Sequence, residues 1–144
     1  MIPWVEGSDK IEKFGTLRGK MQDFRNLKVW HKSHALTLDV CRATQEYPRS
    51  ESYGLTSQTR RSAASVPANL AEGCGRESSV EYRRHIQIAL GSANELEYHL
   101  LLGHDLSYLS DAIHLTLQAQ VQEVKRMLTG LRERIGDRAR FPDA

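Results

Sequence analysis

The chain has 144 residues, a length that suits a single domain with one hydrophobic core. Its content of 40% hydrophobic and 26% charged residues excludes a disordered or fibrous chain. The net charge of +2 is too small to indicate a nucleic-acid partner, so the distribution of charge matters more than its sum.

Two cysteines, Cys41 and Cys74, are too few for a disulfide framework, and we expect reduced thiols in a soluble, cytoplasmic protein. No apolar run approaches the roughly 18 residues of a membrane-spanning helix, so no membrane partner is expected. Residues 1–22 mix glycines with charges of both signs and lack helical periodicity. They are expected to form a flexible N-terminal extension rather than a signal peptide, and Met21 is an alternative start.

The first helix is expected over about residues 27–47 and should end at Pro48. Apolar residues lie on two of its faces, one carrying Trp30 and Leu38 and the other Leu36 and Val40. One bundle core does not need so wide an apolar surface. The pattern therefore predicts that this helix also contacts a second copy of the chain.

The second helix is expected over about residues 54–72 and contains Pro67. Proline lacks the N–H that would bond to the carbonyl of Ala63, so a kink is predicted. The run Gly73-Cys74-Gly75 is expected to be the turn that follows.

The third helix is expected to run from the cap at Ser78 to about His104. Ser78 and Glu81 have the spacing of a capping box. The fourth begins after Ser110 and carries a regular apolar seam with steps of three and four residues, formed by Ile113, Leu117, Val121, Val124, Leu128, Leu131 and Ile135. Because the links between helices look short, sequential helices should be antiparallel. The predicted fold class is all-α, an antiparallel up-down four-helix bundle over residues 23–136, followed by a basic polar tail at 137–144.

The sequence contains no motif typical of an enzyme, a phosphate-binding loop or a metal site. The six histidines are interpreted as surface or boundary residues, and neither a metal nor a cofactor is expected. Cys74 is considered as a reactive thiol in a turn, but no base is paired with it.

Polar residues on the second and third helices predict a contact between them. Antiparallel pairing about the turn at Gly75 places Arg60 opposite Ser92 and brings an Arg–Glu95 ion pair within reach. Gly91 would then permit close approach of the two backbones. An inter-helix or inter-subunit ion pair is the favoured interpretation, and ligand contact is the alternative.

Charge is unevenly distributed along the expected bundle. The end that holds the start of the first helix, the second turn and the end of the fourth has twelve basic and seven acidic residues, a formal charge of +5. We expect this basic end to attract RNA or DNA. The candidate nucleic-acid-binding residues are Lys28, Lys32, Arg76, Arg83, Arg84, Arg132 and Arg134. The alternative is a solvated surface with local pairs such as Glu81 with Arg84.

Four separate segments resemble a known family. They are FRNLKVW at 24–30, YGLTSQTRRSA at 53–63, SVPANLAEG at 65–73 and ALGSANEL at 89–96. In this order and spacing, the chain resembles the proteins encoded in intervening sequences of bacterial 23S ribosomal RNA over about residues 23–130. It is also similar to the accessory proteins of diversity-generating retroelements.

The resemblance implies an antiparallel four-helix bundle that assembles into a homopentameric ring. The retroelement accessory proteins look like basic pentameric barrels that engage nucleic acid and a reverse transcriptase. The family supplies no catalytic residues. The matching residues Arg60, Arg61, Asn69, Glu72, Gly91, Ser92 and Glu95 are therefore assigned structural or assembly roles.

Two functions are predicted from these observations. The first is a non-enzymatic oligomeric protein that binds RNA or DNA through its basic end without sequence preference. The second is a protein–protein assembly or adaptor module that binds no nucleic acid.

Overall fold

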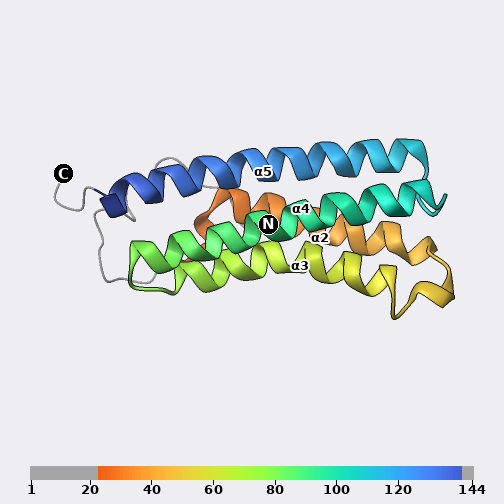
Figure 1. The fold of residues 1–144 in the computed structure, drawn as a ribbon, viewed down its shortest axis with the longest axis horizontal. Helices are drawn as coiled ribbons and strands as arrows, with labels where there is room; N and C mark the ends of the chain where they lie inside the picture. The colour runs from red at the N-terminus through yellow and green to blue at the C-terminus, as the bar shows by residue number, and fades with distance from the viewer. Residues whose placement is uncertain (1–22, 141–144) are drawn as a thin grey trace.

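In the computed structural model, which describes residues 23–140 and side chains up to Gly136, four long helices run along one axis (Figure 1). They are α2 (Lys28–Ala43), α3 (Leu55–Cys74), α4 (Ser79–Asp105) and α5 (Asp111–Arg140). Short 3₁₀ turns η1 (Phe24–Asn26), η2 (Thr44–Glu46) and η3 (Arg49–Glu51) flank α2. No strand occurs within the described range, which confirms the all-α prediction.

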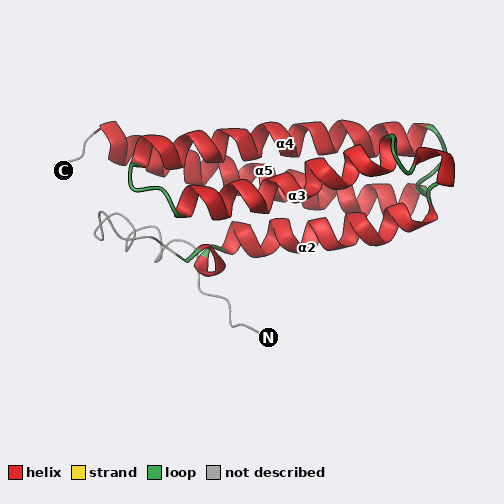
Figure 2. Ribbon diagram, turned by 90° about the horizontal axis from the view of Figure 1, so that it is seen from below, coloured by secondary structure: helices red, strands yellow, loops and turns green. Residues whose placement is uncertain are grey.

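Successive helices are antiparallel, and each helix packs against two others: α3 against α2 and α4, and α5 against α4 and α2. The α3–α4 turn and the C-terminal end of α5 therefore lie at one end of the bundle, and the α2–α3 and α4–α5 connections lie at the other (Figure 2). The expected antiparallel four-helix arrangement is confirmed.

The core contains the apolar stripes of all four helices. The predicted seam of α5 is buried from Leu117 to Ile135, whereas Ile113 at its start stays 45% exposed. On α2, Leu36 and Val40 are buried while Leu38 is 41% exposed. One apolar line of α2 therefore enters this core, while on the other Trp30 packs against the core and Leu38 stays exposed.

Pro67 lies inside α3 without ending it. The carbonyl of Ala63, which would accept from the missing N–H, instead accepts a hydrogen bond from the Thr37 hydroxyl of α2 at 3.0 Å. A contact between two helices therefore replaces a bond within one.

Helix α3 continues to Cys74, so the expected turn at 73–75 is wrong, and the turn covers residues 75–78. The predicted cap of α4 is present, since the Ser78 hydroxyl accepts from the N–H of Glu81 at 3.0 Å.

The link from α2 to α3 is longer than expected because α2 ends at Ala43 and two 3₁₀ turns follow. The Thr44 hydroxyl bonds to the Val40 carbonyl at 2.8 Å, which ends the regular pattern of the helix.

The expected N-terminal extension at 1–22 lies outside the described residues, as do residues 141–144 of the expected tail. At the C-terminal end, α5 continues past Gly136 to Arg140. Within the part of the chain that the structure describes, no helix is long and apolar enough to cross a membrane.

Candidate nucleic-acid interface

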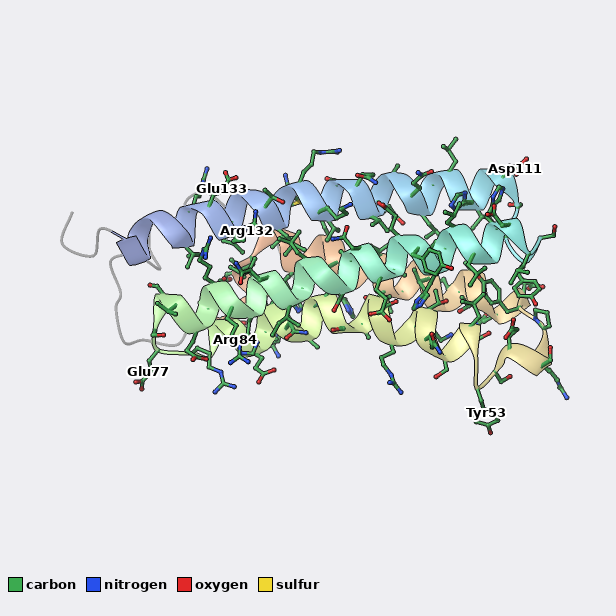
Figure 3. All side chains as sticks on the ribbon, in the orientation of Figure 1. Tyr53, Glu77, Arg84, Asp111, Arg132 and Glu133 are labelled. Carbon is green, nitrogen blue, oxygen red and sulfur yellow. The ribbon has the colours of Figure 1, made fainter. Side chains whose placement is uncertain are left out.

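The antiparallel arrangement divides the charges between two halves of the bundle. The basic half comprises residues 23–33, 72–85 and 123–136, with ten basic and six acidic side chains, a formal charge of +4. The acidic half comprises residues 34–71 and 86–122, with four basic and seven acidic side chains, a formal charge of −3. Arg84 and Arg132 lie in the basic half, and Asp111 lies at the opposite end (Figure 3). The remaining three charges of the predicted end, Asp137, Arg138 and Arg140, have side chains outside the described set.

Two of the candidate cations are engaged in ion pairs. The Lys32 ammonium lies 3.3 Å from Glu123, and the Arg76 guanidinium lies 2.8 Å from Glu72. Both pairs are partly exposed, so each contributes little to stability and leaves its cation near the surface.

Of the other cations of the basic half, Arg25 pairs with Asp23 at 3.4 Å and Lys125 with Glu97 of the acidic half at 3.5 Å, while several others are more open. Among the described residues, no ion pair involves Arg84, Arg126 or Arg134, and all three side chains are exposed. Lys28 is exposed as well, and Arg132 is half-buried. The expected local pair of Glu81 with Arg84 does not form in this structure.

Arg83 lies differently from the other candidates. The Nε atom of Arg83 is buried without a hydrogen-bond partner. It packs closely on Gly136, because a Cβ atom added to Gly136 would lie 2.8 Å from Arg83 Nε. The stem of Arg83 therefore joins the start of α4 to the end of α5.

Arg60 does not pair with Glu95 within the chain, so the inter-helix form of the predicted ion pair is wrong. Its Nε donates to the Thr44 hydroxyl at 2.8 Å, and its Nη2 donates to the Cys41 carbonyl at 3.2 Å. Arg60 therefore caps the C-terminal end of α2. The reason is helical geometry, since Arg60 lies on the side of α3 that faces α2 rather than α4. Arg61 is exposed, and no ion pair within the described residues involves it.

Residues that face α4 from α3 form a polar seam. Ser65 shares a hydrogen bond of 2.8 Å with Ser92, and Asn69 Oδ1 lies 3.3 Å from His85 Nδ1. The same seam continues further into the acidic half of the bundle, where the Ser62 hydroxyl lies 3.2 Å from His99 Nδ1.

Acidic residues border this seam. Glu72 approaches His85 at 4.0 Å, and Glu95 approaches His99 at 3.8 Å. Asn69, Glu72 and Ser92 thus belong to the contact between α3 and α4, whereas Glu95 approaches a histidine of its own helix.

The interpretation of every histidine as a surface or boundary residue is wrong for His85 and His99, which are 9% and 6% exposed. Each finds a polar partner on α3, which lowers the cost of burying an imidazole. Their positions carried a signal, because both follow the three- and four-residue steps of the buried stripe that includes Ile86 and Leu96.

Gly91 does not mediate the approach of α3 to α4, contrary to prediction. It is exposed, and a Cβ atom there would have no neighbour within 4 Å. The close approach is at Gly73 instead, where a Cβ atom would lie 2.9 Å from the Cβ of His85.

The Cys74 thiol is buried and donates to the Tyr82 hydroxyl at 3.6 Å. Burial raises the pKa of Cys74 to about 11, an effect that the Tyr82 hydrogen bond only partly offsets. The thiol is therefore protonated at neutral pH, which makes it a weak nucleophile.

Within the described residues, no group of three or more His, Cys, Asp or Glu side chains is arranged to hold a metal ion. His31 Nε2 lies 2.6 Å from the Arg25 carbonyl, while the His34 ring stacks on Trp30. These two histidines, three residues apart in sequence, thus have separate partners.

A groove of about 620 Å³ lies between the C-terminal end of α2 and the start of α5. Ala43, Leu109, Ile113 and Leu117 give it apolar walls. Gln120 donates to Asp39 at 3.0 Å at its polar edge, and the Gln120 Oε1 atom is buried without a hydrogen-bond partner.

The comparisons with known proteins agree with this architecture. A solved structure of a protein of unknown function from Bacteroides thetaiotaomicron VPI-5482, assigned to the S23 ribosomal protein family, matches with a TM-score of 0.68 and 23% identity. The match covers 73% of this chain and 95% of that one. No curated protein matches the chain. The family model of the 23S rRNA-intervening sequence proteins matches residues 25–130, most of the chain and all four helices at least in part, and the chain therefore belongs to that family.

Proposed function

We propose that this chain is a non-enzymatic, self-associating cytoplasmic protein that binds RNA or DNA through its basic half. The observation that carries the proposal is the separation of charge, +4 in one half and −3 in the other. A chain with a small net charge then still presents a positive surface to phosphates. Arg84, Arg126 and Arg134 supply exposed guanidinium groups without an ion pair among the described residues.

The mode of binding follows from the groups available. Guanidinium and ammonium groups contact phosphates, which carry no sequence information. Binding is therefore expected to be salt-sensitive and indifferent to sequence.

Charge reversal tests the proposal. Fluorescence anisotropy of a labelled oligonucleotide at low salt compares the wild type with the Arg84→Glu/Arg134→Glu variant. Loss of two phosphate contacts and the added repulsion should weaken binding about tenfold or more. The matched control, Arg42→Glu/Arg49→Glu, changes the net charge equally in the acidic half and should weaken binding much less. Equal weakening by both variants, or no binding by the wild type, would contradict the proposal.

Self-association is supported by apolar side chains that the bundle leaves outside its core. Leu38 on α2 and Ile88 and Tyr98 on α4 are 41%, 43% and 59% exposed. Ile88, Gly91 and Tyr98 share the outer face of α4 by helical spacing. A pentameric ring is proposed for the assembly from the family resemblance.

Sedimentation velocity tests self-association with a pair of glycine variants. Gly91 and Gly130 both lie on exposed helix surfaces, and a Cβ atom at either would have no neighbour within 4 Å. If the outer face of α4 contacts a sister chain, Gly91→Gln should lower the sedimentation coefficient, whereas Gly130→Gln should not. A wild type that sediments as a monomer at micromolar concentration would contradict self-association.

The apolar groove favours a second function, that of a protein-binding adaptor. Its apolar walls suit a partner segment with apolar side chains. In that case Ile113→Asp should abolish capture of a protein partner, and nuclease treatment should not. A partner whose capture requires Arg84 and is lost with nuclease would instead support the first function.

A further inference from the structure

The start of α2 carries an aromatic cluster that the charge distribution does not explain. The Trp30 and His34 rings stack with centroids 4.9 Å apart and an interplanar angle of 12°. Phe24 lies on the same tryptophan at 4.9 Å, tilted by 54°. Within this cluster the His34 side chain is exposed, whereas Trp30 and Phe24 are half-buried.

Local structure holds the cluster in place. Trp30 and His34 are four residues apart, a spacing that places them on one face of the helix. The Asp23 carboxylate caps η1 by accepting from the N–H of Arg25 at 2.9 Å, and His31 bonds to the Arg25 carbonyl. The His34 ring, the outermost of the cluster, therefore rests on Trp30, which local contacts hold in place before any ligand binds.

Basic side chains lie near these rings, two of them in exposed ion pairs, Arg25 with Asp23 at 3.4 Å and Lys32 with Glu123 at 3.3 Å. The Arg25 guanidinium lies 4.7 Å from the centre of the Phe24 ring, and residues 23–33 carry three basic side chains against one acidic. Lys28 is exposed at the first turn of α2. Cations beside stacked rings are what surfaces that bind unpaired nucleotides use, because the cations contact the phosphates and the rings stack on the bases.

We infer that His34, supported by Trp30, is a stacking site for an unpaired base, so that the protein prefers single-stranded RNA or DNA to a duplex. This inference rests on the proposed function and names its ligand class. Bases in a duplex already stack on each other and are not available to His34. Phosphate contacts alone would not make the protein prefer a flexible single strand to a duplex of equal length.

The test measures the affinity for three fluorescein-labelled ligands of one length: a single strand, the same strand in a duplex, and a single strand with abasic sites. His34→Ala should weaken binding of the intact single strand about 5-fold or more and leave duplex binding unchanged. Abasic sites should cause a similar loss in the wild type and little further loss in His34→Ala. His34→Phe, which keeps an aromatic face, should retain the affinity.

The matched control is His114→Ala. His114 also stacks on a neighbouring ring, His104 at 4.4 Å and 15°, but it lies in the first turn of α5 close to Asp111 and far from the cations of residues 23–33, so it should have no effect. Equal single-strand affinity of the wild type and His34→Ala would overturn the inference, as would wild-type affinity for the duplex equal to that for the single strand. If Arg84→Glu/Arg134→Glu still weakens binding in that case, the proposed function stands without the stacking site. A wild type that binds none of the ligands contradicts the proposed function itself.

Discussion

Ser107 adopts a left-handed backbone with φ of 66° in the turn between α4 and α5. The N–H of Tyr108 bonds to the Gly103 carbonyl at 2.8 Å and that of Ser107 to the His104 carbonyl at 2.9 Å, the pattern that usually places glycine at the position of Ser107. We predict that Ser107→Gly raises the free energy of unfolding by about 0.5–1 kcal/mol, because glycine adopts this conformation without strain. Urea denaturation checks it, with Ser107→Ala as a control that should give no gain.

His104 should make stability depend on pH in a defined direction. A hydrogen bond to Asp111 at 2.6 Å raises the pKa of His104 above its ordinary value, and Asp105 adds to the effect. Since the pKa is raised in the folded state, the contribution to stability is complete below about pH 6.5 and is lost as the pH rises through the folded pKa. NMR titration should show a raised His104 pKa that Asp111→Asn lowers. An unchanged value in that variant would contradict the assignment.

The polar residues at the contact between α3 and α4 were easier to predict from the sequence than their partners. Asn69, Glu72 and Ser92 do lie at the contact between α3 and α4, but Arg60 lies on the other side of α3 and Glu95 approaches only His99 of its own helix. A shift of one position along a helix rotates a side chain by about 100° around the helix axis. Which neighbouring helix a polar residue faces therefore depends on the rotation of its own helix, and the spacing of residues in the sequence defines that rotation only loosely.

At the scale of elements, α3 depends on its contact with α2. The Thr37 hydroxyl shares its proton between the Ser33 carbonyl at 2.8 Å and the Ala63 carbonyl left open by Pro67. Thr37→Val should therefore cost about 1–3 kcal/mol of unfolding free energy, because the Ala63 carbonyl loses its partner.

A double-mutant cycle isolates this interaction. Pro67→Ala restores the N–H that bonds to Ala63, so Thr37→Val should cost clearly less in that background. Equal costs in both backgrounds, measured by chemical denaturation, would show that the hydroxyl does not compensate for the proline.

The four helices were predictable because their stripes are long and regular. The connections were less so. Helix α3 continues through Gly73, which packs closely on His85, and ends at Cys74. Helix α2 ends early, and Thr44 and Arg60 bond to its last carbonyls. Tertiary contacts decide such boundaries, and a single sequence does not display them.

At the scale of the whole molecule, chain topology creates the asymmetry of charge. The stretch from 86 to 122 carries no lysine or arginine, and antiparallel folding places it in the same half as the acidic residues 39, 46 and 51. The basic end was predictable because it depends only on helix direction. The aromatic cluster was not, because it depends on how η1 folds onto α2.

The most direct test of the central claim is the salt dependence of oligonucleotide binding. Each neutralised phosphate contributes a slope of about −0.7 for a single strand in a plot of log K against log salt. If four to six cations of the basic half contact phosphates, the wild-type slope should be about −3 to −4, and Arg84→Glu/Arg134→Glu should be shallower by about 1.4 or more. A slope near zero, or one that this variant leaves unchanged, would contradict binding through the basic half.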